Sequence, residues 1–154
     1  MLSLLSQELL SVEDLVYIKS LKTLGIVKGL EEDKYIVDVF NRGVNLLDRE
    51  DLTNNLIGID LKEVNLERAD LERADLRGAN LYGANLKEAK LYWTNLSGAN
   101  LYWANLYGAN LYGANLYGAD LRGAYLEEAN LNRADLEGAI GIDILMIDES
   151  GLYI

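Results

Sequence analysis

The chain offers few residues that could carry out covalent chemistry. It contains no Cys and no His, so it lacks a thiol nucleophile, thiolate metal ligands and the commonest general base. Its Ser residues have no His to activate them, and carboxylate pairs such as Asp70 with Asp75 are what any acidic surface provides. No phosphate-binding glycine motif or nucleophile-elbow motif is present. We therefore predict a protein that is not an enzyme and that uses no cofactor or metal.

The residues best suited to a function are aromatic, and their chemistry is molecular recognition. Eight of them fall between Tyr82 and Tyr117, a stretch whose only charged side chains are Lys87, Glu88 and Lys90. Tyr and Trp are enriched at the hot spots of protein interfaces. The candidate interaction surface comprises Trp93, Trp103, Tyr82, Tyr92, Tyr102 and Tyr112. The alternative is that these rings only stabilise a half-exposed β surface by stacking along it.

A five-residue repeat must position these aromatic residues. Leu recurs at every fifth position from Leu56 to Leu136, which makes 17 units. Ala stands two residues before Leu from Ala69 onward, with Thr94 as the one exception, and Asn or Asp usually lies between the two. The repeat therefore fixes the backbone on which the aromatic residues stand.

A period of five excludes the regular alternatives. On an α-helix five residues advance by about 500°, so the leucines would scatter around the cylinder. In an unbroken strand an odd period would send successive leucines to opposite faces. The remaining solution is a chain that turns once per unit, with Ala and Leu facing inward on each short segment. Four segments make a square coil of about 20 residues, and successive coils pair their backbones about 4.8 Å apart.

The tandem A(N/D)LXX units resemble those of the pentapeptide-repeat family. The resemblance covers residues 54–138 and implies a mostly β fold, a right-handed quadrilateral β-helix of about four coils. The predicted core consists of the leucines at the centre of the coil, namely Leu76, Leu81, Leu86, Leu91, Leu96, Leu101, Leu106, Leu111 and Leu116. Some family members mimic duplex DNA and bind type II topoisomerases, so the resemblance also implies an alternative function, a DNA-mimicking inhibitor or protector of such an enzyme.

The square coil places residues that are 20 apart above one another. One outward column reads Lys62, Tyr82, Tyr102 and Arg122, and it predicts two stacked rings with a cation at each end.

Complementary charges are predicted to stack in the first coils. The expected pairs are Glu67 with Lys87, Arg68 with Glu88, and Asp70 with Lys90.

The two tryptophans replace the Gly that is usual at their position in the unit. Each is followed 20 residues later by a glycine, Gly113 above Trp93 and Gly123 above Trp103. A large ring over a bare backbone should leave an exposed edge, which favours Trp93 and Trp103 as contact residues.

The segments before and after the repeat do not follow the five-residue period. In residues 1–53 we predict a small helical N-terminal cap: one helix from Val12 to Gly25, and a later one from Glu31 to Gly43. This prediction rests on apolar spacing and on acidic residues that suit a helix start. Residues 139–154 are rich in Ile and Leu. They are predicted either to fold over the last coil as a lid or to form a homodimer interface, because an open coil end exposes unpaired backbone.

The distribution of charge along the chain helps to choose between a protein-binding scaffold and a DNA mimic. The net charge of −11 disfavours binding to nucleic acid, and no apolar run is long enough for a membrane span or resembles a signal peptide. Residues 1–55 hold 10 acidic and 6 basic side chains, 56–138 hold 12 and 8, and 139–154 hold 3 and none. The acidity is therefore spread over the chain instead of concentrated on the repeat. We expect a cytoplasmic, non-catalytic scaffold, monomeric or a homodimer through the C-terminal end, that binds an unknown protein partner; the DNA mimic ranks second.

Overall fold

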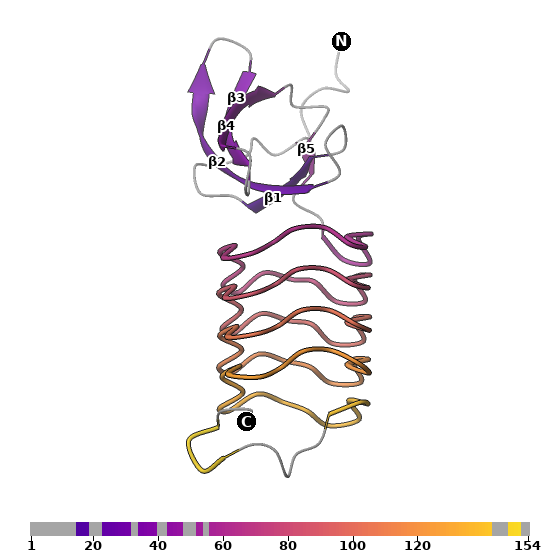
Figure 1. Cartoon of the computed structure of the whole chain (residues 1–154). Helices are drawn as coiled ribbons and strands as arrows, with labels where there is room; N and C mark the ends of the chain where they lie inside the picture. The colour runs from indigo at the N-terminus through magenta and orange to yellow at the C-terminus, as the bar shows by residue number, and fades with distance from the viewer. Residues whose placement is uncertain are drawn as a thin grey trace.

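The computed structural model describes seven segments of the chain. They are residues 15–18, 23–31, 34–39, 43–47, 52–53, 56–142 and 148–151. An antiparallel sheet comes first in the chain, and the coil follows it as a stack of similar turns (Figure 1).

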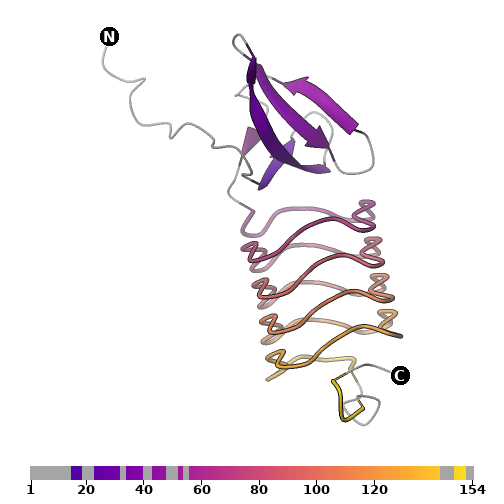
Figure 2. The ribbon, with the colours of Figure 1, turned by 90° about the vertical axis from the view of Figure 1, so that its left-hand side faces the viewer.

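The sheet contains five strands. They are β1 (Leu15–Ile18), β2 (Thr23–Glu31), β3 (Lys34–Val39), β4 (Gly43–Leu47) and β5 (Leu52–Thr53). Their order is β4-β3-β2-β1-β5, with every neighbouring pair antiparallel. The long strand β2 is visibly curved (Figure 2), and its register with β3 shifts between Val27 and Gly29.

The helical prediction for this part of the chain is wrong. Strands β1 and β2 occupy half of the first expected helix, and β3 lies within the later one. The apolar spacing of three was misleading, because these segments are rich in Val, Ile and Thr, whose branched side chains favour extended backbone. Glu31, where the later helix was expected to begin, is the last residue of β2 and pairs with Lys34 of β3, only three positions on. The sequence also suggests helix caps at Ser11 with Asp14 and at Asp48 with Asp51, and these four residues lie outside the described residues.

The repeat forms the predicted quadrilateral β-helix. Thirteen parallel bridges join residues 20 apart, from Asp60 with Asn80 to Asp120 with Ile140. Ile140 therefore still pairs with the coil, although the sequence placed it in the tail. The bonds between coils run in both directions: Leu61 donates its N–H to Asn80 O at 2.8 Å, and Asn80 donates to Ile59 O at 2.8 Å. Backbone pairing along the axis explains why the coils stack in Figure 1.

The interior holds the small and large residues that the repeat predicts. All nine leucines of the predicted core are 0% exposed, and Ala residues such as Ala99, Ala104 and Ala109 are equally buried. Thr94 is the buried polar residue of the described coil, and its Oγ1 donates to Leu71 O at 2.7 Å. The hydroxyl of Thr94, the one exception to the Ala pattern, is therefore hydrogen-bonded within the coil and needs no ligand.

Corners form at the two residues after each Leu. Gly occupies the second of these positions at nine of the 17 corners from Leu56 to Leu136; Gly83, for example, has a φ of 61°. The four corner columns are numbered from the one that contains residues 62–63. The first contains residues 62–63, 82–83, 102–103 and 122–123; the second 67–68, 87–88, 107–108 and 127–128; the third 72–73, 92–93, 112–113 and 132–133; and the fourth 57–58, 77–78, 97–98, 117–118 and 137–138.

Eight non-glycine residues adopt the same left-handed backbone at the second corner position. They are Glu63, Arg68, Arg73, Glu88, Trp93, Trp103, Glu128 and Arg133, with φ between 56° and 61°. An L side chain in this region costs about 1–2 kcal/mol. Both tryptophans therefore stand where the backbone favours glycine.

Replacing Arg73 with Gly should raise the free energy of unfolding by about 0.5–1 kcal/mol, because relief of the left-handed strain exceeds the extra entropy of Gly in the unfolded chain. The ion pair that is lost, Arg73 with Glu72 at 3.6 Å, is exposed and contributes little. Denaturant unfolding measures the change. Arg77→Gly is the matched control, since Arg77 is at the first corner position and lacks a positive φ; it should lower stability. Equal effects of the two substitutions would contradict the assignment of strain.

Candidate interaction surface

The outward column on the first corner stacks as the sequence predicts. Lys62 Nζ lies 5.1 Å from the centroid of the Tyr82 ring, Tyr82 and Tyr102 are stacked at 5.7 Å with an interplanar angle of 14°, and Arg122 Cζ lies 5.4 Å from the Tyr102 centroid. Trp103 joins them, with its ring 5.3 Å from that of Tyr102. The prediction of two stacked rings between two cations is confirmed.

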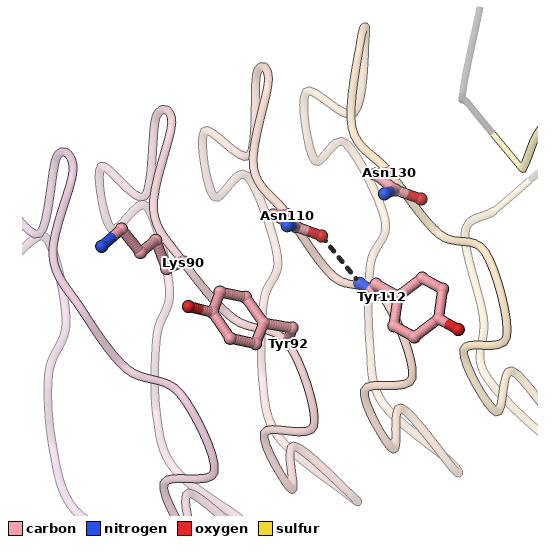
Figure 3. Close-up of a pocket in the computed structure, with 5 residues that line it drawn as sticks. All are labelled: Lys90, Tyr92, Asn110, Tyr112 and Asn130. Carbon is pink, nitrogen blue, oxygen red and sulfur yellow. Dashed lines mark hydrogen bonds between the residues drawn. The ribbon is translucent and has the colours of Figure 1, made fainter.

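A second aromatic group occupies the third corner column. Trp93 and Tyr112 meet edge to face at 5.6 Å and 82°, and Arg133 Cζ lies 5.6 Å from the Tyr112 centroid. Tyr92 stands one coil before Tyr112. Figure 3 shows the two tyrosines side by side along the rod, beside Lys90.

The six candidate residues therefore form two groups of three, not one surface. Tyr82, Tyr102 and Trp103 stand on the first corner, and the other three stand on the third. The two corners are ten residues apart in a coil of 20, so they lie on opposite edges of the square. A single flat partner cannot cover both groups at once.

Trp93 and Trp103 are the exposed members of these groups, at 50% and 57%. A Cβ built on Gly113 would lie 2.6 Å from Trp93 Cε3, and one on Gly123 would contact Trp103 Cδ1 and Nε1. Each indole therefore packs against the glycine that the 20-residue register places above it. The glycine leaves room for the ring, and half or more of each tryptophan stays open to solvent.

The side between the first and second corners carries a groove that the sequence did not single out. Lys87, Trp103, Asn105, Tyr107 and Tyr125 line it, and its volume is ≈ 440 Å³. Tyr125 is 62% exposed and replaces the Asn of the repeat. This Tyr at a position that is usually Asn was the feature of the sequence that could have indicated the groove.

A second groove, of ≈ 470 Å³, lies on the next side of the square. Lys90, Tyr92, Asn110, Tyr112 and Asn130 line it (Figure 3). Asn110 Oδ1 accepts the backbone N–H of Tyr112 at 3.2 Å, and Lys90 Nζ is 3.1 Å from Asp70 Oδ2. The polar groups at this groove are thus partly committed to the coil itself.

Hydrogen bonds within the coil account for the repeated Asn. Asn100 Oδ1 accepts the backbone N–H of Tyr102 at 3.1 Å, and its Nδ2 donates to Asn80 Oδ1 at 3.3 Å. The same pattern recurs at Asn85 and Asn105. The Asn ladder therefore holds the corners and joins successive coils.

Two of the three predicted charge pairs form. Arg68 Nε lies 2.7 Å from Glu88 Oε2, and Lys90 pairs with Asp70. Within residues 56–142, Lys87 pairs with Glu88 at 3.8 Å instead of with Glu67. Lys87 Nζ also lies 5.7 Å from the Tyr107 centroid, so the ring competes for its position.

These contacts change the pKa of several surface groups. The hydrogen bond from Arg77 lowers the pKa of Asp75 below its ordinary value of 3.8, and the hydrogen bond from Arg68 lowers that of Glu88. The hydroxyls of Tyr92 and Tyr107 bond to the carboxylates of Glu72 and Glu128, and each bond raises the pKa of its tyrosine. Asp75 and Glu88 therefore remain charged at neutral pH, and both tyrosines remain neutral.

A short segment after the repeat lies against the C-terminal end of the coil. At the C-terminal end Leu131 donates its N–H to Gly151 O at 2.8 Å, and Asn132 Nδ2 donates to Ser150 O at 3.1 Å. Residues 150 and 151 thus contact the last coil, and both the lid and the dimer interface stay predictions. Residues 143–147 and 152–154 lie outside the described part of the chain.

The family follows from these features and from comparison with known proteins. A family model for pentapeptide repeats matches residues 55–91, 84–123 and 119–142. The matched residues make up more than half of the chain, and the protein belongs to the pentapeptide repeat family. Members of this family are right-handed quadrilateral β-helices, which agrees with the 20-residue register of the coil.

Several solved structures are similar to the chain. One is alr5209, a pentapeptide repeat protein from Nostoc Pcc 7120, at 34% identity over 56% of this chain and 78% of that one, with a TM-score of 0.50. Another is HetL, a pentapeptide repeat protein involved in heterocyst differentiation regulation in the cyanobacterium Nostoc sp. strain PCC 7120, at 32% identity over 63% of this chain and 62% of that one, with a TM-score of 0.25. The chain thus spans less than two thirds of the length of HetL.

A third similar structure is QnrB1, a plasmid-mediated fluoroquinolone resistance protein. It is 20% identical over 54% of this chain and 53% of that one, with a TM-score of 0.33. No curated protein sequence matches the chain.

Proposed function

We propose that this protein is a non-catalytic scaffold that binds a protein partner through the aromatic residues on its corners. The observation that carries the proposal is the placement of Trp93 and Trp103. Both take a left-handed backbone that favours glycine, and both leave half or more of their surface exposed. Strain kept at an exposed aromatic residue is a reason to infer function, and Trp is the residue type most enriched at interface hot spots.

The arrangement of the coil supports a non-catalytic role. Its interior is filled by Leu and Ala, and the grooves described above lie on its outer sides. Among the described residues, no three His, Cys, Asp or Glu side chains are grouped to hold a metal ion. None of the described segments is a helix long and apolar enough to cross a membrane.

The DNA-mimic alternative remains the weaker proposal. A mimic of duplex DNA would present a continuous row of negative charge along the rod, whereas residues 91–119 contain no charged side chain. In the first coils Arg68, Arg77 and Lys90 pair with neighbouring carboxylates and cancel part of the negative charge. Inhibition of DNA supercoiling by a purified type II topoisomerase at micromolar protein would reverse this ranking.

A capture experiment tests the scaffold. The immobilised protein should retain a specific partner from an extract of its source cells, and the double variant Trp93→Gly/Trp103→Gly should lose that partner. Gly is the usual residue at these positions and suits their backbone, so the coil should persist. The matched control is Glu63→Gly/Arg73→Gly, which makes the same backbone change on the same two corner columns. Partners retained equally by both double variants would refute the proposed surface.

A further inference from the structure

We propose that the groove lined by Lys87, Trp103, Asn105, Tyr107 and Tyr125 binds a proline-rich segment of a partner, in the polyproline II conformation and with a basic residue beside it. The inference rests on the proposed scaffold function and names the chemistry of the partner. The groove extends over three successive coils, because Lys87 belongs to one coil, Trp103 and Tyr107 to the next, and Tyr125 to the one after that.

The spacing of the coils suits such a ligand. A polyproline II helix repeats every three residues, about 9.3 Å, and two coil steps of about 4.8 Å give nearly the same distance. Trp103, Tyr107 and Tyr125 are 57%, 36% and 62% exposed, so each offers ring surface to a ligand. Aromatic-lined grooves are the usual receptors of proline-rich segments, whose preformed conformation reduces the entropy lost on binding.

Hydrogen-bonding chemistry narrows the choice of ligand. Asn105 Oδ1 already accepts the N–H of Tyr107 at 3.1 Å, and Asn105 Nδ2 donates to Asn85 Oδ1 at 3.4 Å. The Tyr107 hydroxyl bonds to Glu128. The donors that remain are the indole N–H of Trp103 and those N–H groups of Lys87 that its contacts with Glu88 and the Tyr107 ring leave unused. The groove thus offers mostly donors, which complements a proline-rich backbone that has carbonyl acceptors and few N–H groups.

The same chemistry argues against other occupants. An added β-strand would need free backbone partners, yet Leu106 donates to Tyr125 O at 2.7 Å and Tyr125 donates to Ala104 O at 2.9 Å.

The charge beside the groove indicates the flanking residue. Glu127 and Glu128 occupy the second corner one coil beyond Tyr107, and no ion pair within residues 56–142 includes either of them. The net charge of the protein is −11. An Arg or Lys next to the prolines would therefore find carboxylates at this end of the groove.

Calorimetric titration of the full chain with a synthetic hexaproline peptide that ends in a pair of arginines tests the inference. We expect binding by the unaltered protein and a loss of affinity of more than tenfold in Tyr125→Asn, which restores the residue that the repeat uses at this position. Tyr117→Ser is the matched control: Tyr117 is 54% exposed but lies on the fourth corner column, outside the groove. It should bind as the unaltered protein does.

Two further peptides complete the test. A glycine–serine peptide with the same arginines should not bind measurably, and a hexaproline peptide that ends in glutamates should bind several-fold more weakly. Absence of binding by the arginine-ended hexaproline, equal affinity in Tyr125→Asn, or equal affinity for the glycine–serine peptide would each overturn the inference. If the capture experiment still loses its partner with the tryptophan variant, the scaffold function stands and only the polyproline occupant is rejected.

Discussion

Replacing Leu101 with Ala should lower the free energy of unfolding by about 2–5 kcal/mol. Leu101 is 0% exposed, and the 20-residue register places Leu81 and Leu121 on the coils to either side of it. Backbone bonds hold both coils at a fixed spacing: Leu81 donates to Asn100 O and Leu101 to Asp120 O, each at 2.8 Å. The coils therefore cannot close the space left by the missing side chain, and a cavity remains. Denaturant unfolding measures the loss.

The control for this substitution is Tyr117→Ser, at a side chain that is 54% exposed. It should change the free energy of unfolding by less than about 0.5 kcal/mol, as surface substitutions usually do. If Leu101→Ala has as small an effect as this control, the leucines do not fill the interior.

Replacing Ala109 with Leu should also destabilise the coil, by about 1–3 kcal/mol. Ala109 is 0% exposed and lies between Leu106 and Leu111, both fully buried. Its N–H is bonded to Leu106 O at 2.9 Å, and its carbonyl accepts the N–H of Asn130 at 2.9 Å. The backbone therefore cannot move outward to admit a larger side chain without losing bonds to its neighbours.

Thermal and denaturant unfolding would both report this loss. Tyr117→Leu places the same side chain on the outside and should have little effect. A stabilised Ala109→Leu variant would mean that the interior contains unfilled space beside Ala109, contrary to the account of a close-packed Ala and Leu core.

The coil could be predicted from the sequence because each unit repeats the same physical constraint. A five-residue period with Leu fixed leaves one backbone solution, and the register of 20 then determines which outward residues meet. Lys62, Tyr82 and Arg122 were placed correctly for this reason. Glu67 and Lys87 were not, because Lys87 has a nearer carboxylate in Glu88 and an aromatic ring in Tyr107. Register predicts which residues are neighbours but not which of several neighbours a flexible side chain selects.

The secondary structure of the N-terminal region could not be predicted in the same way. Its segments are short and do not repeat, so apolar spacing over a few residues was consistent with a helix as well as with strands. The branched residues of β2 and β3 carried the correct signal, and pairing between strands decided the outcome. Strand pairing depends on residues distant in sequence, which local patterns do not report.

The sequence and its register of 20 predict the residues of the candidate surface and their separation onto opposite sides of the coil, but not the groove beside Trp103. The sequence identified Trp93 and Trp103 from the glycines that follow them by 20, and both indoles lie against those glycines. It did not identify the groove beside Trp103, since Tyr107 and Tyr125 come from different positions of the unit. Their association depends on the side of the square that they share with Asn105.

The most direct test of the account is a paired measurement on Trp93→Gly/Trp103→Gly. With the captured partner, its dissociation constant should rise by roughly 30-fold or more, as expected for loss of about 2 kcal/mol at an interface hot spot. Its free energy of unfolding should change by less than about 1 kcal/mol, because relief of left-handed strain offsets the lost ring contacts. An unchanged dissociation constant in a folded variant would contradict the claim that the exposed tryptophans of the coil form the binding surface.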